Sequence, residues 1–188
     1  GIGYPCLTIG HAAGAPSVLE GLHKVASNNC GNSLTQPHVL MGGDWTYPVS
    51  VIPETIIGKD DPARTVAFGQ AVTLSFEGLN PAAVYVLDMS FLSDDATRAQ
   101  SIRAGNVTLE ERLTLPRAET VRRTYALDPA VYAAGKLQVT VTCLAGPNAV
   151  VSSVDVYSSD PLLLKPTELS TDGFFDGIGL PPSSVDGE

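Results

Sequence analysis

The chain has 188 residues, a formal net charge of −9 and a hydrophobic fraction of 44%. A chain of this length can bury a sizeable core in one domain. Its negative charge argues against nucleic acid and anionic membranes as partners, because both attract clustered Lys and Arg. The sequence contains no run of about 18 apolar residues that would predict a membrane span.

The composition favours β-structure. Charged residues make up only 16% of the chain, whereas Gly (18 residues) and Pro (14 residues) are plentiful. Many turns and few long charged helices are typical of an all-β domain. The chain begins at Gly1 rather than at a Met and shows no signal peptide, so we expect a mature or excised piece.

Residues 1–48 show poor periodicity and are predicted to be an irregular N-terminal portion. Gly, Ala, Asn and Pro are frequent in this part of the chain. One short helix is predicted, with Ser17 as the N-cap of VLEGLHKVA and Glu20 at the capping-box position. The segment NNCGNS, residues 28–33, is predicted to be a turn.

A period-two pattern begins near residue 65 and predicts strands. In AVTLSFEGL, Val72, Leu74 and Phe76 share one face, which indicates a half-buried strand. In AVYVLDMSFLS, which follows a turn at residues 78–81, the residues from 85 to 91 alternate in the same way. The second face of this strand also carries valines, so we expect it to be covered on both sides at one end.

The following segments continue the strand pattern. SDDATRAQ, residues 93–100, is a polar loop, and QSIRAGNVTLEERLTLP predicts a hairpin around Ala104-Gly105-Asn106. TVRRTYALD is another strand, and DPAVYAAG is a short helical turn with Pro129 early and Gly135 at its end. KLQVTVTCLAG and AVVSSVDVY are predicted to pair as the last hairpin.

The pattern as a whole predicts an antiparallel β-sandwich or jelly roll, with turns at the 8–12-residue spacing typical of these folds. We expect one domain over residues 1–160, with the strand-rich core in residues 49–160. Residues 161–188 are expected to form a C-terminal tail or a linker. The alternative is that this segment packs back on the domain, because its LLL and its two adjacent phenylalanines are apolar.

The three cysteines, Cys6, Cys30 and Cys143, do not have the short spacing of a zinc site. Cys143 is in phase with the apolar residues of LQVTVTC and is predicted to point into the core. Cys6 and Cys30 either form a disulfide, if the protein is secreted, or stay reduced and buried.

Three segments resemble galactose-binding-like β-sandwiches, which include malectin-like domains and many carbohydrate-binding modules. These segments are FEGLNPAAVYVLDMSFLSDD, YALDPAVYAAGKLQVTVT and GPNAVVSSVDVY. The resemblance covers about residues 65–158. It implies a non-catalytic carbohydrate-binding module of a larger extracellular glycan-active protein, secreted or at the cell surface. A polysaccharide or oligosaccharide and a neighbouring domain of the same polypeptide are the partners that it implies.

The resemblance also implies ligand-binding residues. An Asn in the loop before the last strand often contacts the sugar in such modules, and the corresponding residue here is Asn148. An amide offers two donors and an acceptor to sugar hydroxyls; the alternative is a residue that only shapes the turn. Trp45, the only Trp, and Tyr47 lie in the Gly-rich segment GGDWTYP and can stack on a sugar. The alternative for Trp45 is to plug one end of the sandwich.

A cation site is a further expectation. Asp94 and Asp95, next to Arg98, are loop carboxylates of the kind that bind Ca²⁺; a solvated loop is the alternative. The chain lacks the Glu-x-Glu pattern near the first strand that would match the usual Ca²⁺ site of the resembled family. Asp155 alternates with valines and is expected to face a metal or a hydrogen-bond partner at the sheet edge.

Catalysis is not indicated by any motif. The three histidines lie in the irregular N-terminal portion, and no nucleophile elbow, H-E-x-x-H, phosphate loop or dinucleotide fingerprint occurs. The 20 acidic residues leave a glycosidase-type carboxylate pair open. A structural accessory domain or a protein-interaction sandwich without a sugar ligand is the alternative function.

Overall fold

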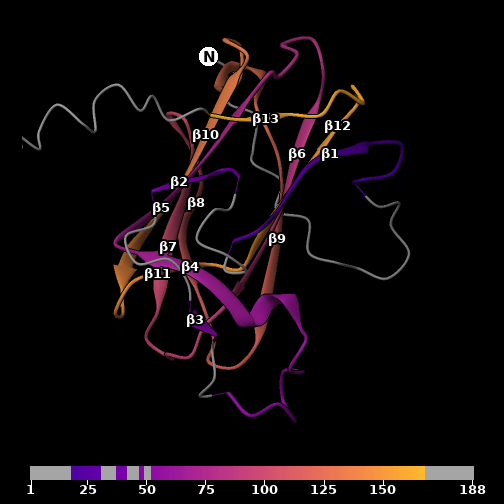
Figure 1. Ribbon diagram of the computed structural model, residues 1–188. Helices are drawn as coiled ribbons and strands as arrows, with labels where there is room; N and C mark the ends of the chain where they lie inside the picture. The colour runs from indigo at the N-terminus through magenta and orange to yellow at the C-terminus, as the bar shows by residue number, and fades with distance from the viewer. Residues whose placement is uncertain (1–17, 31–36, 42–46, 49–51, 168–188) are drawn as a thin grey trace, which may run out of the picture.

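The computed structural model describes residues 18–30, 37–41, 47–48 and 52–167, and these form an antiparallel β-sandwich (Figure 1). The predicted all-β class is therefore confirmed. The strands are β1 His23–Asn29, β2 Val39–Met41, β3 Tyr47–Pro48, β4 Thr65–Gly69, β5 Ala71–Glu77, β6 Tyr85–Leu92, β7 Ala99–Ala104, β8 Val107–Thr114, β9 Thr120–Ala126, β10 Lys136–Ala145, β11 Ala149–Val151, β12 Ser153–Ser158 and β13 Lys165–Pro166. Two 3₁₀ turns are η1 Pro62–Arg64 and η2 Pro129–Val131. None of the helical segments in these ranges is long and apolar enough to cross a membrane.

The strands form three sheets in which every pairing is antiparallel. One layer has the order β1-β12-β6-β9, and the opposite layer has the order β13-β5-β10-β7-β8, with β2 also on β5. A small sheet, β11-β4-β3, lies at one end of the sandwich (Figure 1).

Alternation explains the core. Val72, Leu74 and Phe76 of β5 are buried, and Leu74 pairs with Val139 of β10. All eight residues of β6 are buried, so this strand is covered on both sides along its whole length and not only at one end, as the sequence predicted. The predicted β7–β8 hairpin and the η2 turn are confirmed, with Asp128 as the cap of η2.

The predicted helix over VLEGLHKVA, residues 18–26, is wrong. Residues 18–21 form a turn, and Gly21 has a φ of +77°, a left-handed conformation in which a helix stops. The next residues form β1, which pairs with β12 along its whole length. A register shift between Lys24 and Ala26 interrupts the alternation of β1, so the helical spacing was the stronger signal in the sequence.

The predicted last hairpin is also wrong. β10 pairs with β5 and β7, whereas β11 pairs with β4 and β12 lies between β1 and β6. Gly146, with a φ of +83°, lies at the turn that takes the chain from β10 into β11 of the small end sheet, and β12 then continues in the opposite layer. A register shift between Cys143 and Ala145 ends the alternation of β10, so Cys143 is only half-buried and not fully in the core.

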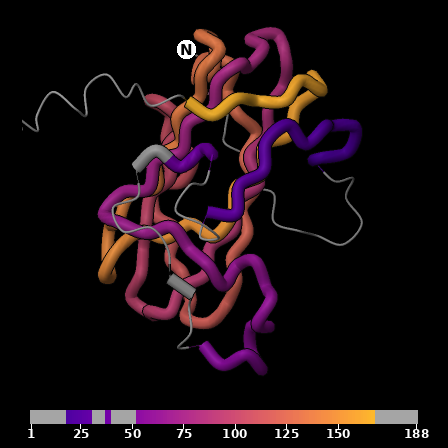
Figure 2. The backbone as a smooth tube through the Cα atoms, viewed as in Figure 1, coloured from indigo at the N-terminus to yellow at the C-terminus, as the bar shows by residue number. Residues whose placement is uncertain are grey.

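The first and last described segments lie side by side (Figure 2). The N–H of the buried Leu164 donates to the carbonyl of Val25 at 2.9 Å, and β13 pairs with β5. The packed part of the chain therefore extends past residue 160. The two phenylalanines of the expected tail lie outside the described residues.

Candidate functional site

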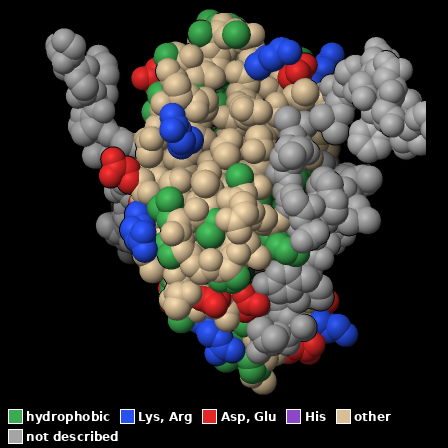
Figure 3. All heavy atoms as spheres, turned by 90° about the vertical axis from the view of Figure 1, so that its left-hand side faces the viewer, with side chains coloured by type: hydrophobic (Ala, Val, Ile, Leu, Met, Phe, Trp, Pro, Cys, Tyr) green, Lys and Arg blue, Asp and Glu red, His purple; other side chains and the backbone are tan. Residues whose placement is uncertain are grey.

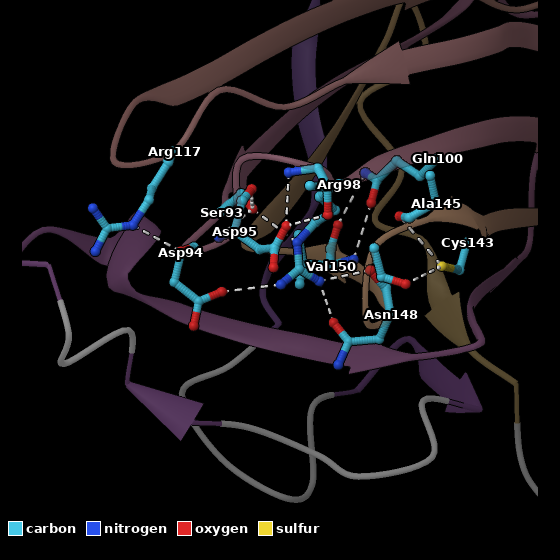
Figure 4. A network of polar contacts seen from close by, with 12 residues as sticks. Ser93, Asp94, Asp95, Arg98, Gln100, Arg117, Cys143, Ala145, Asn148 and Val150 are labelled. Carbon is cyan, nitrogen blue, oxygen red and sulfur yellow. Dashed lines mark hydrogen bonds and ion pairs between the residues drawn. The ribbon is translucent and has the colours of Figure 1, made fainter.

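A buried arginine organises the loops at one end of the sandwich. The Arg98 side chain is only 1% exposed, and its Nε donates to Ser93 Oγ at 2.8 Å. Its Nη1 donates to the carbonyl of Asn148 at 2.6 Å and to the Oδ1 of the same residue, and its Nη2 donates to Asp94 Oδ1 at 3.0 Å (Figure 4). One guanidinium group thus ties the β6–β7 loop to the β10–β11 loop.

The β6–β7 loop is ordered by its own side chains. Ser93 Oγ donates to the carbonyl of Asp95 at 2.7 Å, and Asp95 Oδ1 accepts from the N–H of Thr97 at 2.7 Å. The hydroxyl and the N–H of Thr97 both donate to this carboxylate, and these bonds lower the pKa of Asp95. Short polar residues that bond to nearby backbone groups favour such turns over regular structure.

The β10–β11 loop packs directly on the arginine. A Cβ atom added at Gly146 would lie 2.9 Å from Arg98 Cα, which only glycine avoids. Gln100, which is fully buried, bonds both the carbonyl and the N–H of Val150, at 3.1 and 3.0 Å. The loop is therefore held to the β6–β7 side by backbone contact as well as by Arg98.

The β8–β9 loop joins the same network. Arg117 Nε donates to the carbonyl of Asp94 at 3.0 Å, and the N–H of Ala118 donates to the carbonyl of Ser93 at 2.8 Å. Ala118 has a φ of +62°, an unfavourable conformation for alanine that the surrounding contacts maintain. Three loops from different parts of the chain are therefore interlocked at this end.

The structure brings together Asp94, Asp95 and Asn148, which the sequence suggested for two separate purposes. Asn148 is half-buried, and the Asp94 side chain is 22% exposed. Among the side-chain hydrogen bonds of the described residues, those of Asn148 and Asp94 use Asn148 Oδ1 and Asp94 Oδ1, and none uses Asn148 Nδ2 or Asp94 Oδ2. The site can therefore offer one hydrogen-bond donor and one acceptor beside the buried guanidinium.

The two aromatic candidates are only partly described. Trp45 lies outside the described residues, and Tyr47 is described by its backbone alone, in β3. Tyr47 pairs with Val66 of β4, whereas Ala149, next to Asn148, pairs with Gly69 on the other side of β4. With about 3.3 Å per residue along a strand and about 4.8 Å between strands, the backbones of Tyr47 and Ala149 are about 14 Å apart.

The described residues contain no group of three or more His, Cys, Asp or Glu side chains that would hold a metal ion. One oxygen of Asp94 is bonded to Arg98, and one oxygen of Asp95 is bonded to Thr97. Whether the two residues bind Ca²⁺ stays a prediction.

Asp155 lies on β12 in the middle of its sheet, not at an edge as expected. Its carboxylate binds Lys24 Nζ and Ser27 Oγ, both at 2.6 Å. Of the metal and the hydrogen-bond partner that the sequence left open for Asp155, the structure therefore shows hydrogen-bond partners. The bond from Lys24 to Asp155 raises the pKa of the lysine.

Of the two cysteines in the described chain, Cys30 is a structural residue. Cys30 is a free, fully buried thiol, and burial raises its pKa to about 12. A thiol with such a pKa is almost never a thiolate near neutral pH and is unreactive. Cys6 lies outside the described residues.

The remaining surface offers weaker candidates. A hollow lined by Glu77, Lys136, Lys165 and Pro166 lies at the other end of β10 from Arg98, about 30 Å away along the strand. An ion pair of 3.2 Å between Lys136 and Glu77 occupies its wall. On the face shown in Figure 3, the charged side chains of the described residues lie towards the margins, with acidic and basic groups close together at the lower end. The interlocked loops are thus the most organised polar site of the described chain.

Sequence reasoning missed the organising role of Arg98 and the contribution of Gln100. The i,i+4 spacing of Asp94 and Arg98 was the available signal, and it is weak, because most such pairs lie on the surface. The contact with Asn148 spans 50 residues of sequence, so no local pattern reports it.

No protein-family model and no curated protein matches the chain. Among solved structures, the ANX2 ectodomain from Arabidopsis thaliana is similar with a TM-score of 0.56 and 12% identity over 74% of this chain and 50% of that one. The ANX1 ectodomain from the same plant has a TM-score of 0.54 and 13% identity over 74% of this chain and 49% of that one. A family 35 carbohydrate binding module from an environmental isolate has a TM-score of 0.40 and 13% identity over 79% of this chain and 93% of that one.

The chain spans about half the length of the two ANX ectodomains. At 12% and 13% identity, these likenesses concern the fold alone. The galactose-binding-like, malectin-like sandwich that the sequence resembles is therefore confirmed as a fold.

Proposed function

We propose that the chain is a non-catalytic carbohydrate-binding module of a larger extracellular glycan-active protein, secreted or at the cell surface. The observation that carries the proposal is the pair of polar atoms Asp94 Oδ2 and Asn148 Nδ2, whose side chains are held in place by the buried guanidinium group of Arg98. The coverage of only half of the ANX ectodomains supports a chain that belongs to a longer protein.

A pre-ordered polar site suits a sugar ligand. Sugars bind through many weak hydrogen bonds, and affinity falls when binding must also order the site. The loops here are already bonded to one another, so little conformational entropy is lost on binding. Asn148 and Asp94 together supply a donor and an acceptor to sugar hydroxyls.

Trp45 and Tyr47 complete the proposed surface by stacking on sugar rings. A separation of about 14 Å between the β3 and β11 positions exceeds one sugar ring. The proposed ligand is therefore an oligosaccharide or polysaccharide rather than a monosaccharide.

Affinity gel electrophoresis in soluble xylan, galactan and mixed-linkage glucan tests the proposal. We expect at least one polymer to retard the wild type, and Trp45→Ala and Tyr47→Ala to be retarded less. Tyr157→Ala is the aromatic control, because Tyr157 pairs with Val86 near the opposite end of β6 from Ser93. If Trp45→Ala binds as well as the wild type, the assigned surface is wrong. If no polymer binds, the carbohydrate function is wrong.

A second candidate function is packing against another protein. Val84, Leu162 and Leu163 are 55%, 63% and 69% exposed. Two hydrogen bonds between Val84 and Ser159, of 3.0 and 3.1 Å, place Val84 beside the segment that contains Leu162 and Leu163. Exposed apolar groups that gather in this way favour a protein partner.

Sedimentation velocity of the wild type and of Leu162→Glu/Leu163→Glu tests this candidate with a second copy as the partner. Self-association that the double variant loses would support it. Monomeric behaviour of the wild type at all concentrations would exclude a second copy.

A further inference from the structure

Two side chains share neighbouring nitrogens of the Arg98 guanidinium group. Nη1 binds Asn148 Oδ1, and Nη2 binds Asp94 Oδ1 (Figure 4). Because a guanidinium group is planar and rigid, the two bonds set the relative position of the amide and the carboxylate. Both groups are therefore positioned before any ligand arrives.

Arg98 also sets the polarity of Asn148. A guanidinium group has only donors, so the amide must turn its oxygen towards Arg98 and its nitrogen away. Figure 4 shows the Asn148 nitrogen on the side away from the guanidinium. The carbonyl of Asn148 also accepts from Nη1 at 2.6 Å, which holds the backbone of the same residue. The side-chain nitrogen of Asn148, on the side away from Arg98, can therefore offer a ligand a donor.

The polarity of Asp94 is the opposite. Its Oδ1 accepts from Nη2, and its backbone carbonyl accepts from Arg117, so the residue is held on two sides. Its second carboxylate oxygen is turned to the same side of the network as the Asn148 nitrogen (Figure 4). An ionised carboxylate has no donor. Asp94 can therefore offer a ligand only an acceptor.

We infer that this site takes a vicinal diol of a sugar, with one hydroxyl accepting from Asn148 Nδ2 and its neighbour donating to Asp94 Oδ2. The inference rests on the proposed carbohydrate function and names the ligand group within it. A hydroxyl has one donor and two acceptor lone pairs, so two adjacent hydroxyls satisfy both groups at once. Arg98 is the positioning residue that assigns the two roles.

Other ligand groups match this pair less well. A carboxylate of an acidic sugar would accept from Asn148 but would face the negative charge of Asp94. The chain also carries a net charge of −9, which repels anions. An ammonium group would bind Asp94 but would leave the Asn148 donor without an acceptor. A neutral diol avoids both problems.

Single isosteric substitutions test each role. Asn148→Asp keeps an oxygen towards Arg98 but loses the outward donor, and Asp94→Asn keeps its oxygen towards Arg98 but loses the outward acceptor. The polymer among xylan, galactan and mixed-linkage glucan that retards the wild type is the probe. We expect each variant to bind it roughly tenfold more weakly, the effect of about one hydrogen bond. Asn106→Asp in the exposed β7–β8 turn controls for the added charge.

The double variant Asp94→Asn/Asn148→Asp exchanges the two roles and restores the net charge of the wild type. A diol can reverse its donor and acceptor hydroxyls, so we expect binding to recover to within about threefold of the wild type. A ligand group of fixed polarity would not permit this recovery. Thermal unfolding of all variants shows whether each retains the fold at the temperature of the binding assay.

The outcomes separate the inference from the proposed function. If the wild type binds none of the polymers, the carbohydrate function fails. If the wild type binds and both single variants bind equally well, the function stands and the assigned pair is wrong. If the single variants lose binding and the double variant does not recover it, the pair contacts a group of fixed polarity and the diol is wrong.

Discussion

Replacing Arg98 with methionine removes the guanidinium group but leaves a chain of similar length in the same space. Four hydrogen bonds are lost, and they come from a side chain that is 1% exposed. Breaking a buried charged pair costs about 3–5 kcal/mol when the partner stays buried. The Asp94 side chain is 22% exposed and can be solvated in the variant, so we expect the free energy of unfolding to fall by about 3 kcal/mol. That is a large share of the unfolding free energy of a typical domain, which is about 5–15 kcal/mol.

Urea unfolding measures this loss, and the melting temperature should fall by roughly 10 °C. Lys136→Met is the matched control, because the Lys136 side chain is 69% exposed and its ion pair with Glu77 contributes at most about 1 kcal/mol. Arg98→Lys should fall between the two, since an ammonium group cannot replace a planar fork of donors. A loss below about 1 kcal/mol in Arg98→Met would show that the loops do not depend on this residue.

Three further predictions concern the loops, acid and calcium. Gly146→Ala should cost about 1–3 kcal/mol of unfolding free energy, because the added Cβ meets Arg98 and φ is +83°; an unchanged urea midpoint would contradict this. Burial lowers the pKa of His38 below its ordinary value of 6.5, so the unfolded state binds more protons, and stability present above pH 6.5 should decrease on acidification below it. His38→Gln should flatten this part of the pH–stability curve; an equal slope in both proteins would assign it to other groups. If Asp94 and Asp95 bind Ca²⁺, EDTA should lower the melting temperature of the wild type but not of Asp94→Asn/Asp95→Asn, and no effect of EDTA on the wild type would exclude the site.

The strands whose alternation is unbroken could be predicted from the sequence. β5 and the large apolar residues of β6, from Tyr85 to Phe91, follow period two, and the Gly105 turn and the Asp128 cap carry local turn chemistry. These features depend on residues close together in the chain, so the sequence reports them directly. β1 could not be predicted in this way, because its register shift near Lys24 disrupts the pattern.

The alternating residues and the turn signals by themselves determined the all-β class and the resemblance to galactose-binding-like sandwiches. They also identified Asp94, Asp95 and Asn148 as separate candidates. Only the tertiary structure decided that Arg98 joins two of them and that the chain enters the small end sheet, as β11, after Gly146. The physical reason is that strand pairing and loop contact depend on residues about 50 positions apart, whose meeting is set by burial of the whole core.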